Sequence, residues 1–198
     1  QAISPLGVTG LSININREKT NVILGDTVKE LYGKAYIEDA LLDTEFGISP
    51  LSFYQVNRDQ TEVLYGKAME FAELSGRERV LDAYCGTGTI GIIASKNAKS
   101  VIGVELNGDA VKDAKVNAML NSVENIEFFE DDAGKFMVKT ALEGENFDVV
   151  IMDPPRAGAS LEFLRCLVEL APQKIVYVSC NPETLARDLS FLTRKGYK

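Results

Sequence analysis

The chain has 198 residues, of which 45% are hydrophobic, and a formal net charge of −8. No apolar run approaches the roughly 20 residues of a membrane-spanning helix, and no secretory leader is recognisable, so we expect a cytoplasmic protein without a membrane segment. The chain has no histidine, which excludes serine–histidine and cysteine–histidine nucleophile pairs, and the wide spacing of Cys85, Cys166 and Cys180 predicts neither disulfides nor a metal site.

The start of the chain has the composition of short β-strands. Residues 11–16 (LSININ) alternate apolar and polar side chains, and residues 21–24, 36–37 and 45–48 are also β-prone. A segment of this size is too small to enclose a core of its own. We therefore predict that residues 1–48 are a β-rich remnant of a central domain that packs on the rest of the chain.

From residue 49 the pattern changes to alternating helices and strands. Apolar residues at helical spacing predict a helix over residues 61–75, which Gly76 closes. Asn107 and Ser160 are predicted N-caps, and Pro182 is predicted to open the last helix. The predicted strands are residues 79–84, 100–106, 126–130, 147–152 and 175–178. This alternation predicts that residues 49–198 form an α/β domain with a doubly wound, mostly parallel sheet.

Ligands bind such sheets beyond the carboxyl ends of the strands, so the residues after each strand are candidates for a site. After the first strand, Gly86, Gly88 and Gly91 fit the pattern G-x-G-x-x-G, whose glycines let the backbone approach a nucleotide. Glu105 follows the second strand, about 20 residues further on, where a carboxylate can accept both hydroxyls of an adenosine ribose. These residues suit NAD and S-adenosylmethionine equally.

The last three strands end in further polar groups. Asp131 and Asp132 follow the third strand, where a carboxylate could receive an adenine amino group or cap the next helix. Asp153 follows the fourth strand and precedes two prolines, which stiffen the loop and aim the carboxylate into the cleft. Cys180 ends the fifth strand, where it is either a core gap-filler or a nucleophile.

Five motifs give residues 48–197 a resemblance to the RNA uracil-5-methyltransferases, which are Rossmann-like class I enzymes dependent on S-adenosylmethionine. The motifs are ISPLSFYQVN (48–57), LDAYCGTGTIG (81–91), VIGVE (101–105), DPPRAGA (153–159) and YVSCNPETLARD (177–188). The last of them is the most specific. The resemblance implies transfer of a methyl group from S-adenosyl-L-methionine to carbon 5 of a uridine in RNA, with a cysteine bonded covalently to carbon 6.

By this resemblance Cys180 is the nucleophile. The family's cofactor and substrate contacts fall on Gln55, Tyr84, Thr89, Glu105, Asp132 and Asp153, to which the glycine pattern adds Gly86 and Gly88. Asp131 could be shifted into the place of Asp132. Asp153 could hydrogen-bond the pyrimidine or the cofactor, and Arg156 could stabilise negative charge on the ring or contact a phosphate.

The sequences of the motifs SPLSFYQVN and DAYCGTG resemble those of the family members that act on ribosomal RNA more than those of the members that act on transfer RNA. We therefore expect 23S ribosomal RNA as the substrate. The family's general base is a glutamate after the last motif, beyond Lys198, so no base is assigned. The family's N-terminal RNA-binding barrel, and the four cysteines that bind an iron–sulfur cluster in some members, have no counterpart here. We therefore expect a fragment with low activity and weak RNA binding.

Three other hypotheses remain open. An N-methyltransferase could use the Asp-Pro-Pro loop on an amino group of nucleic acid or protein, with Cys180 in a structural role. An NAD oxidoreductase could use the glycine-rich loop and Glu105. A non-catalytic RNA-binding module is disfavoured by the net charge of −8 and the lack of a basic stripe, although basic residues outnumber acidic ones in residues 154–198.

Overall fold

A five-stranded parallel sheet forms the centre of the computed structural model, which describes residues 7–19, 23–25 and 27–198. Helices cover both of its faces, so β8 is a run of apolar, buried residues rather than an alternating pattern. The strands are β5 (Arg79–Ala83), β6 (Ser100–Glu105), β7 (Ile126–Glu130), β8 (Val149–Met152) and β9 (Lys174–Tyr177).

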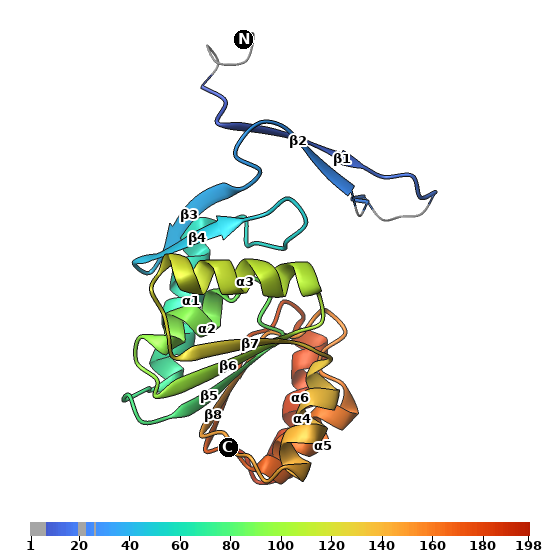
Figure 1. Cartoon of the computed structure of the whole chain (residues 1–198). Helices are drawn as coiled ribbons and strands as arrows, with labels where there is room; N and C mark the ends of the chain where they lie inside the picture. The colour runs from blue at the N-terminus through green and yellow to red at the C-terminus, as the bar shows by residue number, and fades with distance from the viewer. Residues whose placement is uncertain (1–6, 20–22, 26) are drawn as a thin grey trace.

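The chain enters the sheet at its middle strand and later reverses direction. The order across the sheet is β7-β6-β5-β8-β9, so the chain moves outward from β5 to β7 and then returns to the other side of β5 (Figure 1). The loops that follow β5, β6 and β8 therefore diverge at the carboxyl ends of these strands. This reversal is the place where ligands bind in open α/β sheets.

In the part of the chain that the structure describes, six helices cover the sheet in two groups (Figure 1). Residues of α1 (Arg58–Ala72), α2 (Thr89–Ser95) and α3 (Gly108–Leu120) pack into one apolar cluster. Residues of α4 (Ala133–Leu142), α5 (Leu161–Leu170) and α6 (Pro182–Thr193) pack into a second cluster. Adjacent residues of β5 supply both clusters, with Val80 in the first and Leu81 in the second, as the pleat of a doubly covered strand requires.

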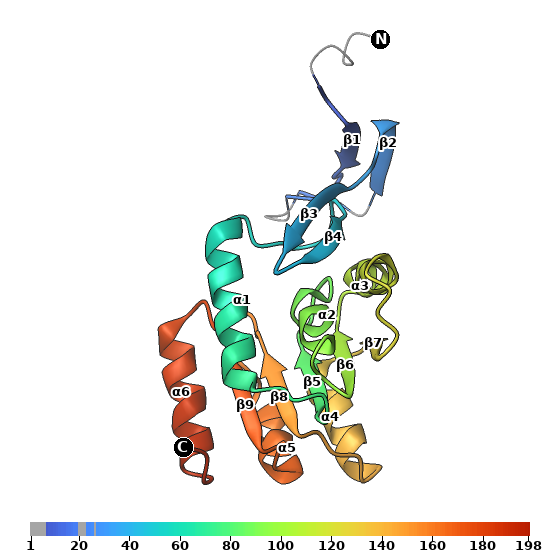
Figure 2. The same cartoon turned by 90° about the vertical axis from the view of Figure 1, so that its left-hand side faces the viewer.

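Two antiparallel hairpins precede the sheet. The first pairs β1 (Gly10–Ile15) with β2 (Thr27–Gly33), and the second pairs β3 (Ile37–Leu41) with β4 (Thr44–Ile48). Leu41, Phe46 and Ile48 of the second hairpin are buried in the cluster formed by α1, α2 and α3. The first hairpin projects away from the sheet (Figures 1 and 2). The second hairpin thus shares the core of the α/β unit.

The structure confirms the predicted fold class, a parallel α/β sheet with a β-rich start. The side chains of Asn107 and Ser160 cap α3 and α5 by accepting backbone N–H groups, and Pro182 occupies the first turn of α6. The division of the chain between residues 48 and 49 stays a prediction.

Several predicted boundaries are wrong. Helix α1 begins at Arg58, after the cap residue Asn57, and ends at Ala72, so Gly76 does not close it. Glu73 ends α1 instead, with a left-handed φ of 49° and its N–H bonded to the Met69 carbonyl. Strand β9 starts at Lys174, one residue before the predicted start, and strand β2 was not predicted at all.

The β-prone stretch 21–24 lies partly outside the described residues, and its described members Ile23 and Leu24 form a bend. Among the described residues, no helix is both long and apolar enough to cross a membrane.

Candidate active site

A small cavity of about 50 Å³ lies where β5 and β8 end. Five of the residues predicted to contact a cofactor line it: Gln55, Tyr84, Gly86, Thr89 and Asp153. They come from the loop before α1, the loop after β5, the start of α2 and the loop after β8. The structure therefore brings together residues that are nearly 100 positions apart in the sequence.

The glycine-rich loop after β5 has an unusual backbone. Tyr84, a non-glycine residue, has a left-handed φ of 64°, and Gly86 and Gly88 have φ values of 55° and 80°. A Cβ atom on Gly88 would lie 2.8 Å from the Phe128 ring, so only glycine fits at this position. A strained aromatic residue between a strand and such a loop is typical of a functional site.

The Glu105 carboxylate lies against this loop. Its Oε2 accepts the Gly86 N–H at 3.1 Å, and its Oε1 accepts the Asn107 N–H at 2.8 Å. The two bonds fix the carboxylate beside the glycine-rich turn without an ion pair. Glu105 does not line the small cavity. It lies at the end of β6, which is the position where the sequence predicts a contact with the ribose.

Asp132 is the N-cap of α4. Its Oδ1 accepts the Lys135 N–H at 3.0 Å, and the Asp132 N–H bonds to the side chain of Asp131 at 2.8 Å. Burial, together with the negative charges of Asp132 and Asp188, raises the pKa of Tyr84 to about 12, which places the Asp132 carboxylate within electrostatic range of the cavity wall. The helix-cap interpretation is therefore correct, and an adenine contact by Asp132 stays a prediction.

Two carboxyl groups near the cavity hold protons unusually tightly. Burial raises the pKa of Asp153 to about 6. Burial, together with the negative charges of Asp153 and Glu105, also raises the pKa of Asp82, in β5, to about 8. Asp82 Oδ2 is buried and has no hydrogen-bond partner among the described residues. A buried, unsatisfied carboxyl next to a cavity marks a functional site.

Cys180 lies in an exposed turn between β9 and α6. Its two neighbours lock this turn, because the Asn181 N–H donates to Ser179 Oγ and the Ser179 hydroxyl donates to the Asn181 carbonyl, at 3.1 and 3.0 Å. The Asn181 side chain also caps α6 through the Glu183 N–H and donates to the Arg156 carbonyl at 3.0 Å. The thiol is therefore held at a defined place beside the Asp-Pro-Pro loop.

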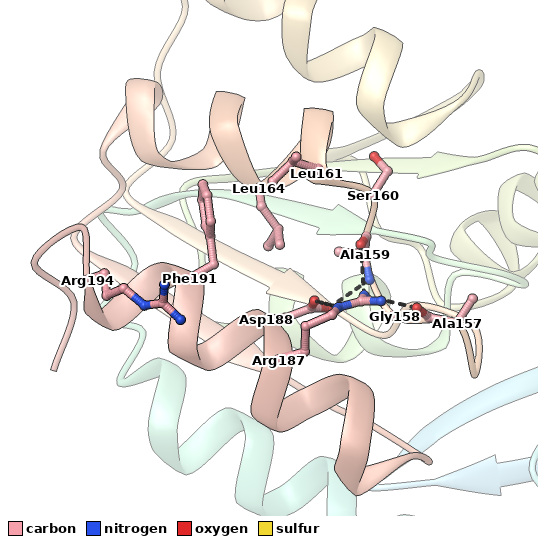
Figure 3. A pocket seen from close by; sticks show the side chains of 10 residues that line it. All are labelled: Ala157, Gly158, Ala159, Ser160, Leu161, Leu164, Arg187, Asp188, Phe191 and Arg194. Atoms are coloured by element: carbon pink, nitrogen blue, oxygen red, sulfur yellow. Dashed lines mark hydrogen bonds and ion pairs between the residues drawn. The ribbon is translucent and has the colours of Figure 1, made fainter.

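A second set of bonds ties that loop to α6. Asp188 is fully buried. It accepts the Ala159 N–H at 2.9 Å, and the Arg187 guanidinium donates to it at 2.7 Å (Figure 3). It also accepts the Tyr177 hydroxyl at 2.8 Å. Arg187 also donates to the Ala157 carbonyl at 3.0 Å. The motif PETLARD therefore holds the loop of residues 153–160 in place.

These residues also form one wall of an open cavity of about 640 Å³ between α5 and α6, shown in Figure 3. None of the residues predicted from the sequence to form a site lines it. Cys180 and Arg156 do not line the small cavity either. Cys180 lies on the loop after β9, and Arg156 lies on the loop after β8. The two strands are parallel neighbours, so both loops lie at the carboxyl ends of the strands.

The sequence did not point to several residues of the cavity wall. Tyr65 of α1 is hydrogen-bonded to Gln55, and burial raises its pKa. Its signal was hidden because a tyrosine at helical spacing is usually read as a core residue. Asp82 of β5 lies behind the wall and does not line the cavity. Its position could have been noticed in the sequence, since an acid in the middle of a buried apolar strand is exceptional. The other unpredicted wall residues are Phe53, Tyr54, Cys85, Thr87 and Ile90.

The site suits S-adenosyl-L-methionine. Gly88 leaves no room for a side chain, Glu105 offers a carboxylate at the ribose position, and the Asp153 carboxyl in the cavity wall suits a ligand with a positive charge. A sulfonium cofactor carries such a charge at its reacting centre. The residues that would hold it are Gln55, Tyr84, Gly86, Gly88, Thr89, Glu105 and Asp153.

Solved structures agree with this assignment. The chain is similar to the tRNA (uracil-54, C5)-methyltransferase of Pyrococcus abyssi in complex with S-adenosyl-L-homocysteine, with 38% identity and a TM-score of 0.78 over 91% of this chain and 44% of that one. An S-adenosylmethionine-dependent methyltransferase from Agrobacterium tumefaciens, 23% identical with a TM-score of 0.62 over 77% of this chain and 56% of that one, shares the fold.

Sequence relatives agree as well. Uncharacterized RNA methyltransferases of Clostridium tetani and Halalkalibacterium halodurans are 48% and 49% identical over 97% and 93% of the chain. The chain spans only 42% and 40% of the length of these relatives. The model of the tRNA (uracil-5-)-methyltransferase family matches residues 27–196. The chain therefore belongs to the tRNA (uracil-5-)-methyltransferase family, and its cofactor is S-adenosyl-L-methionine.

Proposed function

We propose that the protein methylates carbon 5 of a uridine in RNA, with Cys180 as the covalent nucleophile. The observation that carries this proposal is the placement of Cys180. Its thiol is exposed on a turn that Ser179 and Asn181 lock, next to the Asp-Pro-Pro loop and at the edge of the sheet that holds the cofactor residues. A cysteine in a purely structural role would be expected in the core, as Cys85 and Cys166 are.

The chemistry requires a thiolate because carbon 5 of uracil is a weak nucleophile. Cys180 Sγ adds to carbon 6, and the electrons of the ring double bond become available at carbon 5. S-adenosyl-L-methionine, when bound, would supply the electrophilic methyl group to carbon 5, and the bond between its sulfur and the methyl carbon would break to leave S-adenosyl-L-homocysteine. A base then removes the proton from carbon 5, and the bond between Sγ and carbon 6 breaks to restore the ring and the thiolate. We assign no residue of this chain to that base.

Asp153 and Arg156 are the proposed substrate contacts. Asp153 lies in the wall of the cavity and can hydrogen-bond the polar edge of the pyrimidine. Arg156 is exposed beside Asn181 and can balance negative charge on the ring oxygen or on a phosphate. A target base within folded RNA must leave its stack to reach both loops.

The covalent step can be tested with RNA that carries 5-fluorouridine, because fluorine in place of the carbon 5 hydrogen blocks release of the enzyme. The complete protein should form an adduct with this RNA that survives denaturing electrophoresis. Cys180→Ala should abolish the adduct, and Cys166→Ala, which alters a buried cysteine in α5, should retain it. An adduct that persists in Cys180→Ala would contradict the mechanism.

The main competing function is N-methylation through the Asp-Pro-Pro loop, with Cys180 in a structural role. The nucleoside formed decides between the two, because digestion and mass spectrometry separate 5-methyluridine from N-methylated nucleosides. Methyl transfer that continues in Cys180→Ala and yields an N-methylated product would favour the competing function.

We further propose 23S ribosomal RNA as the substrate and the cytoplasm as the location. The sequences of two motifs, SPLSFYQVN and DAYCGTG, support the ribosomal substrate. The similar Pyrococcus abyssi protein, in contrast, is named a tRNA methyltransferase. Incubating the complete protein with unmodified 23S ribosomal RNA and with unmodified tRNA, in separate reactions with labelled cofactor, tests the choice. Label in tRNA alone would overturn the ribosomal proposal.

A further inference from the structure

One face of α3 carries three polar residues at intervals of four: Asp113, Asn117 and Asn121. Residues with this spacing lie in a row along one side of a helix. All three bond to β4 or to the segment that follows it. Asp113 Oδ2 accepts the Ser52 hydroxyl at 2.6 Å and the Ser49 N–H at 3.4 Å. The row thus attaches β4 and the segment after it to the sheet domain.

Asn121 forms the far end of the row and pairs with β4 as a neighbouring strand would. Its Oδ1 accepts the Glu45 N–H at 2.9 Å, and its Nδ2 donates to the Glu45 carbonyl at 2.6 Å. Both bonds go to the same residue of the hairpin. Asn121 therefore fixes the hairpin to α3, and its hydrogen bonds with the described residues do not reach the glycine-rich loop.

Asn117 differs from Asn121 because it bonds in two directions. Its Oδ1 accepts the Gly47 N–H of β4 at 2.8 Å, and its Nδ2 donates to the carbonyl of Thr87, in the glycine-rich loop, at 3.2 Å. Its side chain is fully buried. Only an amide in this orientation offers an acceptor to one backbone group and a donor to the other.

The loop that Asn117 holds is the one that forms the cavity. Thr87 lines the cavity, and its hydroxyl lies 3.3 Å from that of Thr89, a predicted cofactor contact. The segment after β4 supplies Gln55 to the same cavity. Asn117 is thus bonded to one wall of the cavity through Thr87 and to β4, the strand that leads into the segment with Gln55, without lining the cavity itself.

We infer that Asn117 is a positioning residue for cofactor binding, which holds the glycine-rich loop at the correct distance from β4, the strand that leads into the segment with Gln55. The inference rests on the cofactor assignment rather than on the choice of base or RNA. Asn117→Asp separates the two bonds. A carboxylate still accepts the Gly47 N–H, but it faces the Thr87 carbonyl with another acceptor and so releases the glycine-rich loop.

The test is titration calorimetry of the complete protein with S-adenosyl-L-homocysteine, together with a thermal melt of each variant. Asn117→Asp should raise the dissociation constant about tenfold. A buried polar group without its partner costs about 1–3 kcal/mol, and about 1.4 kcal/mol of binding free energy corresponds to a tenfold change in the dissociation constant. Asn121→Asp is the matched control. It removes the donor bonds of Asn121 to the Glu45 and Asn117 carbonyls at a half-buried position, so we expect a smaller loss of melting temperature and a dissociation constant within about twofold of the original.

A purely structural role predicts a different pattern, in which affinity falls in proportion to stability in both variants. That pattern, or unchanged affinity in a folded Asn117→Asp protein, would overturn the inference. If Asn117→Asp fails to fold, Asn117→Ala removes both bonds without adding a charge and should weaken binding at least as much. Because the readout is equilibrium binding, an absence of uridine methylation leaves the result interpretable. An unsubstituted protein that does not bind would instead contradict the cofactor assignment.

Discussion

Asp82 links the acidity of the solution to the stability of the fold. Burial raises its pKa to about 8, from an ordinary value of 3.8. The folded protein therefore keeps a proton that the unfolded chain releases between about pH 4 and pH 8. A carboxyl whose pKa is higher in the folded state favours folding less as the pH rises through this range. Asp153, with a pKa raised to about 6, acts in the same direction.

We predict that Asp82→Asn makes the protein less sensitive to pH. The amide cannot ionise and still accepts the Gly91 N–H, so the free energy of unfolding of the variant relative to the unsubstituted protein should rise by more than about 1 kcal/mol between pH 5 and pH 8. Urea unfolding at several pH values measures it. Asp59→Asn, at an exposed position of α1, should give a constant offset. Parallel curves for Asp82→Asn and the unsubstituted protein would contradict the prediction.

Helix α1 contains an opportunity for stabilisation at Gly66. A Cβ atom added there would meet no heavy atom within 4 Å, and the residue lies in the middle of a 15-residue helix. We predict that Gly66→Ala raises the free energy of unfolding by about 0.5–1 kcal/mol, because alanine loses less backbone entropy in a helix. A thermal melt measures the change. Gly88→Ala should have the opposite effect, since its Cβ would lie 2.8 Å from Phe128 at a φ of 80°.

The bonds between α6 and the loop of residues 153–160 depend on Asp188. Burial raises its pKa, but hydrogen bonds from Arg187, Tyr177 and the Ala159 N–H together hold the pKa below its ordinary value. Its ionised form therefore stabilises the fold above about pH 4, and this contribution is lost as the pH falls through the folded-state pKa.

Asp188→Ala should lower the free energy of unfolding by about 3 kcal/mol at neutral pH, because three donors lose a buried acceptor. The loss should shrink as the pH falls below about 4, because the unfolded chain then takes up a proton at Asp188 before the folded protein does. Denaturant unfolding at two pH values measures both effects. Arg194→Ala, on the same helix and bonded to Ser190, should change stability by less than about 0.5 kcal/mol. Equal losses in the two variants would show that the loop does not depend on Asp188.

The hairpin of β3 and β4 is predicted to unfold together with the sheet. Phe46 is fully buried in the cluster that includes α1, α2 and α3, so Phe46→Ala should lower the free energy of unfolding by about 3–5 kcal/mol in a single transition. Phe71→Ala, at a position of α1 that is 60% exposed, should change it far less. Two separate transitions seen by circular dichroism and by tyrosine fluorescence would show that the hairpin is an independent unit.

Local chemistry made most of the sheet domain predictable from the sequence. Asn107, Ser160 and Pro182 have side chains that mark the start of a helix wherever it packs. Strand β2 was missed because its sequence, TVKELYG, has charged residues and no regular alternation, and its residues are mostly exposed. Propensity is a weak guide where packing does not enforce a pattern.

The site was predictable only where a residue follows a strand. Gln55, Tyr84 and Asp153 line one cavity as expected from their motifs. The role of Asn117 depends on which carbonyl its amide faces across the fold, and no local pattern carries that information. The pKa of Asp82 likewise depends on burial by residues distant in the sequence.

The strand order also has a consequence for the time course of synthesis. A ribosome delivers the chain from the N-terminus, and β5, β6 and β7 are neighbours both in sequence and in the sheet. They can pair before β8 has been made, whereas β8 must come back to β5 past the finished strands. The half that carries Glu105 can thus assemble first. The half that carries Asp153 and Cys180 is completed only when most of the domain has been translated.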